Sequence, residues 1–248
     1  MPLEICIDSP ASARAAHLGG ADRVELCDNL PDGGTTPSLG MIEAVRAAFP
    51  GRLMVIIRPR GGDFLFDADE TDAMLRDIRH ARAAGADGVV IGCLCADGTI
   101  DRDACARLLE AAGPLDVTFH RAFDMSRDLP EALEAVAALG IRRILTSGGA
   151  PDVPAGLATI ARLVQQAGDR LSIMPGGGVT PANLGDIVRA TGVRDIHLSA
   201  RSARPSPMRH RNETCFMGDY TRGREYEIKT ADPAKVRAAR AALDAALR

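Results

Sequence analysis

The chain has 248 residues, of which 46% are hydrophobic and 25% charged, and its formal net charge is −3. These values are typical of a soluble globular protein, and they argue against a general nucleic-acid binder or a protein held on an anionic membrane surface. The chain has no apolar run of the roughly 18 residues that a membrane span needs and no leader-like start, so we expect a cytoplasmic protein with free cysteine thiols.

Eight short apolar stretches predict β-strands, and most of them are separated by Ala- and Leu-rich segments of helical period. Regular alternation of strand and helix predicts a parallel sheet, and eight such units in a chain of this length favour a closed (β/α)8 TIM barrel of the α/β class. An open doubly wound sheet is the alternative. We expect a single domain over 1–248, with strands at 3–7, 23–27, 53–58, 88–94, 116–120, 143–147, 171–174 and 195–199.

Four capping residues stand directly before a proline, which is a typical helix start: Ser9-Pro10, Thr36-Pro37, Thr180-Pro181 and Asp232-Pro233. The last of them predicts a C-terminal helix at 232–247. Residues 200–230 between the eighth strand and this helix are rich in Arg and Ser and predict no regular structure. So long an irregular segment is unusual in a compact domain. We expect it to be a lid or an oligomer contact, with a mobile surface loop as the alternative.

The first two predicted strands share one motif, Glu4-Ile5-Cys6 and Glu25-Leu26-Cys27. Alternate side chains of a strand share a face, so two carboxylates and two thiols would converge if the strands are neighbours. Thiolates favour soft ions such as Cu(I) or Zn(II), which makes Cys6 and Cys27 candidate metal ligands. Buried cysteine also occurs as a small hydrophobic residue, which is the plainer explanation.

More polar side chains follow other predicted strands, at the end of a barrel where active sites lie. Candidates for ligand binding are Arg58, Arg60, His120, His197 and Ser199. Arg58 and Arg60 would clamp an anion, and a divalent metal held by Glu4, Glu25 or His197 is a further candidate. The run Gly176, Gly177 and Gly178, ahead of the expected helix start at Thr180, is typical of a phosphate cradle.

Lysine is nearly absent from the chain. Only Lys229 and Lys235 occur, both near the C-terminus, so no predicted strand end supplies one. A Schiff-base aldolase or a pyridoxal phosphate (PLP) enzyme needs a reactive lysine in its site, and we therefore expect no PLP.

Several motifs spread over nearly the whole chain belong together. They are Glu4-Ile5-Cys6, residues 20–27, Gly33-Gly34-Thr35-Thr36-Pro37-Ser38, Arg58-Pro59-Arg60-Gly61-Gly62-Asp63-Phe64, Thr118-Phe119-His120-Arg121-Ala122-Phe123-Asp124, residues 145–148, Pro207-Met208 and Arg211-Asn212. In these motifs the sequence resembles the CutC copper homeostasis family. The resemblance implies a cytoplasmic (β/α)8 barrel that forms homodimers or larger assemblies, and Cu(I) bound by Cys6 and Cys27.

Two functions therefore compete. The resemblance favours a copper homeostasis protein that binds Cu(I), and we adopt this as the expected function. The residues themselves favour a barrel enzyme on a small anionic or phosphorylated metabolite, an isomerase, epimerase or lyase without a Schiff base. Glu25 and His120 would then be the acid and base, and Arg58 would bind the substrate. A barrel that only binds partners, with a degenerate site, is a third interpretation.

Overall fold

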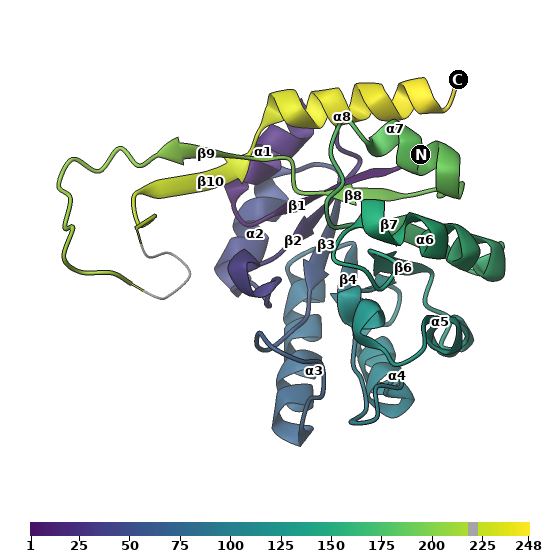
Figure 1. Cartoon of the computed structure of the whole chain (residues 1–248). Helices are drawn as coiled ribbons and strands as arrows, with labels where there is room; N and C mark the ends of the chain where they lie inside the picture. The colour runs from purple at the N-terminus through teal and green to yellow at the C-terminus, as the bar shows by residue number, and fades with distance from the viewer. Residues whose placement is uncertain (218–222) are drawn as a thin grey trace.

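The computed structural model describes residues 1–217 and 223–248. Eight parallel strands form one sheet in the order β7-β6-β5-β4-β3-β2-β1-β8, and β7 also lies beside β8, so that the sheet is nearly closed. Figure 1 shows the strands inside a ring of helices. This TIM barrel confirms the expected fold, with its strands at β1 (Leu3–Ile7), β2 (Arg23–Leu26), β3 (Arg52–Ile56), β4 (Gly88–Ile91), β5 (Asp116–Phe119), β6 (Arg143–Thr146), β7 (Ser172–Pro175) and β8 (Ile196–Leu198).

The helices are α1 (Pro10–Leu18), α2 (Leu39–Ala48), α3 (Ala68–Ala83), α4 (Arg102–Ala112), α5 (Leu129–Ala138), α6 (Val153–Ala167), α7 (Leu184–Thr191) and α8 (Pro233–Ala246), with short 3-10 helices η1 (Leu30–Asp32) and η2 (Arg121–Met125). Ser9 and Asp232 cap α1 and α8 as expected. In the described residues no helix has both the length and the apolar character that crossing a membrane requires.

Two of the expected helix starts are wrong. α2 begins at Leu39 and is capped by Ser38, not Thr36, because the Thr36 hydroxyl and amide bond to the Arg58 carbonyl instead. The backbone N–H of Thr180 donates to the Asn183 side chain, forming a turn, and α7 starts only at Leu184. The glycine run after β7 is therefore not followed directly by a helix N-terminus.

The segment after β8 is more regular than expected. Strand β9 (Arg201–Pro205) pairs antiparallel with β10 (Glu227–Ala231), and Figure 1 shows this ribbon extending away from the barrel. The expectation of an irregular 200–230 is therefore wrong at both ends of the segment. The stretch 206–217 carries no helix or strand, and 218–222 lie outside the described residues.

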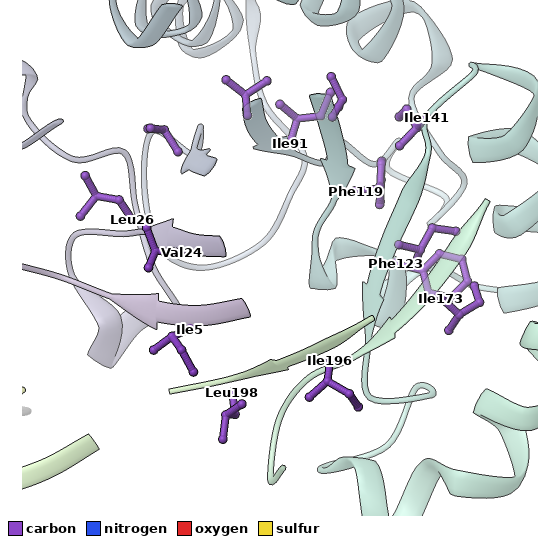
Figure 2. Close-up of a cluster of buried hydrophobic side chains, with 14 of the residues drawn as sticks. Ile5, Val24, Leu26, Ile91, Phe119, Phe123, Ile141, Ile173, Ile196 and Leu198 are labelled. Carbon is purple, nitrogen blue, oxygen red and sulfur yellow. The ribbon is translucent and has the colours of Figure 1, made fainter. Parts of the chain in front are cut away.

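The apolar core lies between the sheet and its helices. Ile5, Val24, Leu26 and Leu198 are buried there, and Figure 2 shows them beside apolar side chains of the other strands. Because side chains alternate along a strand, burying these residues outside the barrel turns their neighbours toward its interior. The interior consequently receives Glu4, Cys6, Arg23 and Glu25, all of them buried.

Candidate functional site

A pocket of about 320 Å3 opens at the C-terminal ends of the strands. Its polar lining comes from at least five strand ends or the loops after them. The lining residues are Cys6, Glu25, Cys27, Leu30, Asp32, Gly33, Ile56, Arg58, Phe64, His120, Arg121, Asp124, Met125, Leu145 and His197. Six of the residues singled out from the sequence thus meet in one place: Cys6, Glu25, Cys27, Arg58, His120 and His197.

The two thiols lie on neighbouring strands at the floor of this pocket. Cys6 is paired in register with Glu25, and the sulfur atoms of Cys6 and Cys27 are 3.8 Å apart. One ligand atom from each of Cys6, Glu25 and Cys27 falls within 4.8 Å of the others. Two thiols and a carboxylate are therefore close enough to share one metal ion.

The two thiols differ in acidity. Hydrogen bonds from Cys27, whose effect is the larger, and from His197 together lower the pKa of Cys6 to about 6, against the effect of burial. The pKa of Cys27 is raised well above its ordinary value because its thiol donates to Cys6 and is buried. Near pH 7 the pair thus holds one thiolate and one thiol, and a thiolate is the form that binds metal.

His197 is fixed from below by a buried carboxylate. Its Nδ1 lies 2.7 Å from Glu4 Oε1, and Glu4 is also ion-paired with Arg23. Burial lowers the pKa of His197, but its bonds to Cys6 and Glu4 outweigh that effect and raise it well above the ordinary value. His197 is therefore a buried cation beside the Cys6 thiolate.

The ion pairs continue through the barrel interior below the pocket. Arg23 Nη2 donates to Asp195 Oδ1 over 2.9 Å, and Arg143 Nη2 donates to Asp116 Oδ2 over 3.0 Å. Arg143 Nε also lies 3.5 Å from Asp195 Oδ1. We call Glu4, Arg23, Asp116, Arg143 and Asp195 the interior ion-pair network. It balances charges that would otherwise be costly to bury.

Glu25 is the second carboxylate at the pocket floor. Its Oε2 lies 3.7 Å from His197 Nε2, and burial raises its pKa to about 8. Glu4, Glu25 and His197 also have ligand atoms within 4.8 Å of one another, which is the divalent-metal arrangement expected from the sequence. Glu4 is already bound to Arg23, however, so it offers a divalent ion less than a free carboxylate would.

On the pocket wall, Arg58 and His120 follow β3 and β5. Arg58 donates through Nη1 to the carbonyls of Asp32 and Gly34 and through Nη2 to that of Gly62, which fastens two loops at the mouth. The His120 ring accepts the Ala122 N–H at Nδ1 over 3.2 Å.

Several residues expected at the site lie elsewhere. Arg60 bonds to Glu70 and the Leu65 carbonyl outside the pocket lining, and Ser199 is also absent from that lining. Gly176 packs so closely that an added Cβ would lie 2.5 Å from Leu145 and 3.1 Å from His197. Gly177 and Gly178 have φ of 103° and 75° and face Arg121 and Asp152, beside the pocket rather than in it.

Arg23, Arg143 and Asp195 support the site without having been expected there. Each is a charged residue within or next to a predicted strand, and that is the signal that could have indicated an ion-pair network inside the barrel. Arg121, which follows a predicted strand, forms a 2.8 Å ion pair with Asp124 at the pocket edge, and no role was expected for Asp124.

Comparison with known proteins gives consistent matches. Residues 1–202 match the family model described as the CutC family. A copper homeostasis protein cutC homolog of Homo sapiens is 48% identical over 235 residues, which cover 95% of this chain and 86% of that protein. A family protein CutC of Chromobacterium violaceum is 50% identical over 244 residues, 98% of each chain. The crystal structure of CutC from Streptococcus agalactiae superposes with a TM-score of 0.77 at 35% identity, covering 80% of this chain and 98% of that one.

Proposed function

The chain belongs to the CutC family, and from this and the pocket geometry we propose that it is a copper homeostasis protein that binds Cu(I) through Cys6 and Cys27. The observation that supports the proposal most directly is the buried thiol pair, 3.8 Å apart, with one member already favouring the thiolate form. Soft thiolate ligands prefer Cu(I) to hard divalent ions.

Binding of Cu(I) by both sulfurs would release the proton that Cys27 holds, because metal ligands must be deprotonated. The His197 cation is adjacent and offsets the charge of a bis-thiolate site. Glu25 lies within 4.8 Å of both sulfurs and can complete a third contact. We further propose that the protein works in the cytoplasm, where thiols stay reduced, as a homodimer or larger homo-oligomer.

A Cu(I) competition titration under reducing, anaerobic conditions tests the proposal. We expect one tight site in the wild type, and loss of that site in Cys6→Ser, Cys27→Ser and the double variant. Cys93→Ser is the matched control, because Cys93 is equally buried but lies outside the pocket lining. Cu(I) affinity that survives in the double variant contradicts the proposal.

A second function is favoured by the size of the pocket. Its volume of about 320 Å3 suits a small organic ligand and exceeds what one metal ion fills. We propose as the alternative an acid–base enzyme acting on a small anionic metabolite, with Glu25 as the proton-transfer group because its raised pKa of about 8 is close to the working pH.

For this alternative, small anions should raise the melting temperature by binding the folded state. A bound substrate should also exchange a carbon-bound proton with D2O, and Glu25→Gln should abolish that exchange while leaving ligand binding in place. A broad set of phosphorylated and non-phosphorylated anions without any shift in melting temperature would count against the enzyme.

A further inference from the structure

Two buried N–H donors in the pocket wall have no partner. In the described part of the chain, His120 Nε2 and Arg58 Nε are inaccessible to solvent and make no hydrogen bond. Both side chains are only 4% exposed, and both line the pocket. Buried donors without a partner are rare in native proteins because each one gives up its hydrogen bonds to water without a replacement.

The hydrogen bonds of His120 fix which nitrogen carries the proton. Nδ1 accepts the Ala122 N–H, so the neutral ring must hold its proton on Nε2. Burial and the nearby charge of Arg58 both lower the pKa of His120, to about 3, which keeps the ring neutral at physiological pH. Nε2–H is therefore a permanent donor rather than a base.

The ring is held on the Arg58 side of the pocket. An added Cβ on Gly92, which follows β4, would lie 2.5 Å from His120 Cε1 and Nδ1, so only glycine leaves room for the ring there. β4 separates β3, which precedes Arg58, from β5, which precedes His120. Phe64 contacts both side chains, at 5.1 Å from the His120 ring and 4.8 Å from the Arg58 guanidinium.

Copper cannot satisfy these groups, because both are hydrogen-bond donors and one carries a positive charge. They call for an oxygen acceptor, and the fixed charge of Arg58 favours a negative one. Three of the five N–H groups of Arg58 already donate to backbone carbonyls, so two remain, which match the two oxygens of a carboxylate in number. Leu30, Ile56 and Met125 line the same pocket and would contact an apolar body.

We propose that His120 Nε2–H and Arg58 form a binding subsite for a small monocarboxylate with a short apolar chain. When the ligand binds, the pocket wall shifts enough to uncover His120 Nε2–H, one carboxylate oxygen accepts from it, and the negative charge lies toward Arg58. The subsite deepens the second function proposed above and rests on its small anionic ligand. Binding at the subsite requires neither copper nor catalysis. It can therefore be tested even if the protein proves to have no enzymatic activity or no Cu(I) site.

The test uses the whole copper-free protein labelled with ¹⁵N-histidine, under reducing conditions. The chain has five histidines, which keeps the side-chain spectrum simple. We expect propionate to shift the His120 Nε2–H signal in a saturable way, and inorganic phosphate to bind at least about tenfold more weakly. A wild-type His120 signal that does not move in saturating propionate overturns the proposal without any variant.

Substitution then assigns the effect. His120→Phe keeps a flat ring but removes the donor, and it should weaken propionate binding by about tenfold or more in calorimetry. His80→Phe is the matched control, since His80 is an exposed histidine on α3, and it should bind like the wild type. Equal affinity in His120→Phe and the wild type would show that propionate binds elsewhere.

Discussion

Glu4 links the pocket to the interior of the barrel. One of its oxygens bonds to His197 and the other to Arg23, so one carboxylate supports both the pocket cation and the interior ion-pair network. Burial would raise its pKa, but Arg23 and His197 lower it to about 2. Glu4 is therefore ionised at every pH at which the protein is expected to work.

Replacing Glu4 by Gln should destabilise the protein strongly. It leaves Arg23 and His197 buried with less negative charge, and breaking one partner of a buried pair costs about 3–5 kcal/mol. Urea unfolding of Glu4→Gln measures this loss. Glu134→Gln is the control, because it breaks an exposed ion pair with Arg170 and should change stability little. Equal effects of the two substitutions would mean that burial does not govern the cost.

His120 should make stability depend on pH. Its folded pKa of about 3 lies below the ordinary value of 6.5, so between these values the unfolded chain binds a proton that the folded protein does not. The free energy of unfolding is therefore unaffected by His120 above pH 6.5. Below that pH it decreases, and at pH 5 it is lower by about 2 kcal/mol.

Urea unfolding of wild type and His120→Phe at pH 7 and pH 5 checks this. The variant should lose about 2 kcal/mol less than the wild type on acidification, since it has no imidazole to protonate. The wild type must be compared with the variant because Glu25 has the opposite effect in both. Its folded pKa is raised to about 8, so its protonation increases the free energy of unfolding as the pH falls through that range. Parallel profiles would contradict a neutral buried His120.

At the level of single residues, strand alternation was enough to predict which side chains meet. Cys6, Glu25 and His197 share the pocket because each occupies an inward position of a strand. Arg60 was misplaced because it stands in a loop, where alternation no longer fixes the direction of a side chain. The unpartnered state of His120 Nε2 could not be predicted, because it depends on Gly92 and Ala122 from other segments.

At the level of elements, α6 and β6 approach unusually closely. Gly156 lies in α6, and an added Cβ there would be 1.8 Å from the Ser147 carbonyl oxygen after β6. Gly40 in α2 has no atom within 4 Å of the same position. Both glycines lie among the first four residues of their helices, and they differ sharply in what surrounds them, which makes them a useful pair.

Gly156→Ala should lower the free energy of unfolding by about 1–3 kcal/mol or more, because α6 must move away from β6. Gly40→Ala should raise it by about 0.5–1 kcal/mol, because alanine is the better helix former. Thermal and urea unfolding of both variants measure the difference. A stabilised Gly156→Ala would contradict the close approach of α6 to β6.

The ends of the eight barrel strands were predictable to within three residues because each strand is a short apolar-rich stretch between segments of helical period. Caps were harder to predict. The Thr180-Pro181 pair begins a turn that Asn183 closes, and the sequence signal for such a turn is the same as for a helix start. β9 was missed because Arg201–Pro205 has no alternation of apolar residues and pairs only with β10.

At the level of the whole molecule, the ribbon of β9 and β10 contacts α1 at its base and extends away from the barrel at its other end (Figure 1). Replacing residues 206–226 by an Asn-Gly turn would join Pro205 to Glu227, which are already opposite each other in the ribbon. We expect the melting temperature to change by only a few degrees, because the barrel core lies elsewhere.

The same variant distinguishes the two roles expected for this segment. As an oligomer contact, its removal should reduce the molar mass in light scattering from an oligomer to a monomer and leave Cu(I) affinity unchanged. As a lid, its removal should change Cu(I) affinity and leave the mass per assembly unchanged. A variant that keeps both properties would contradict both roles.

The interior ion-pair network has a consequence for biosynthesis. Glu4 and Arg23 emerge from the ribosome with the first strands, but their partners Asp195 and His197 belong to the last. A nascent chain can pair Glu4 with Arg23, but it cannot complete the network until β8 has been translated. Partial barrels gain little by burying these charges early, so completion of the chain and closure of the barrel become nearly the same event.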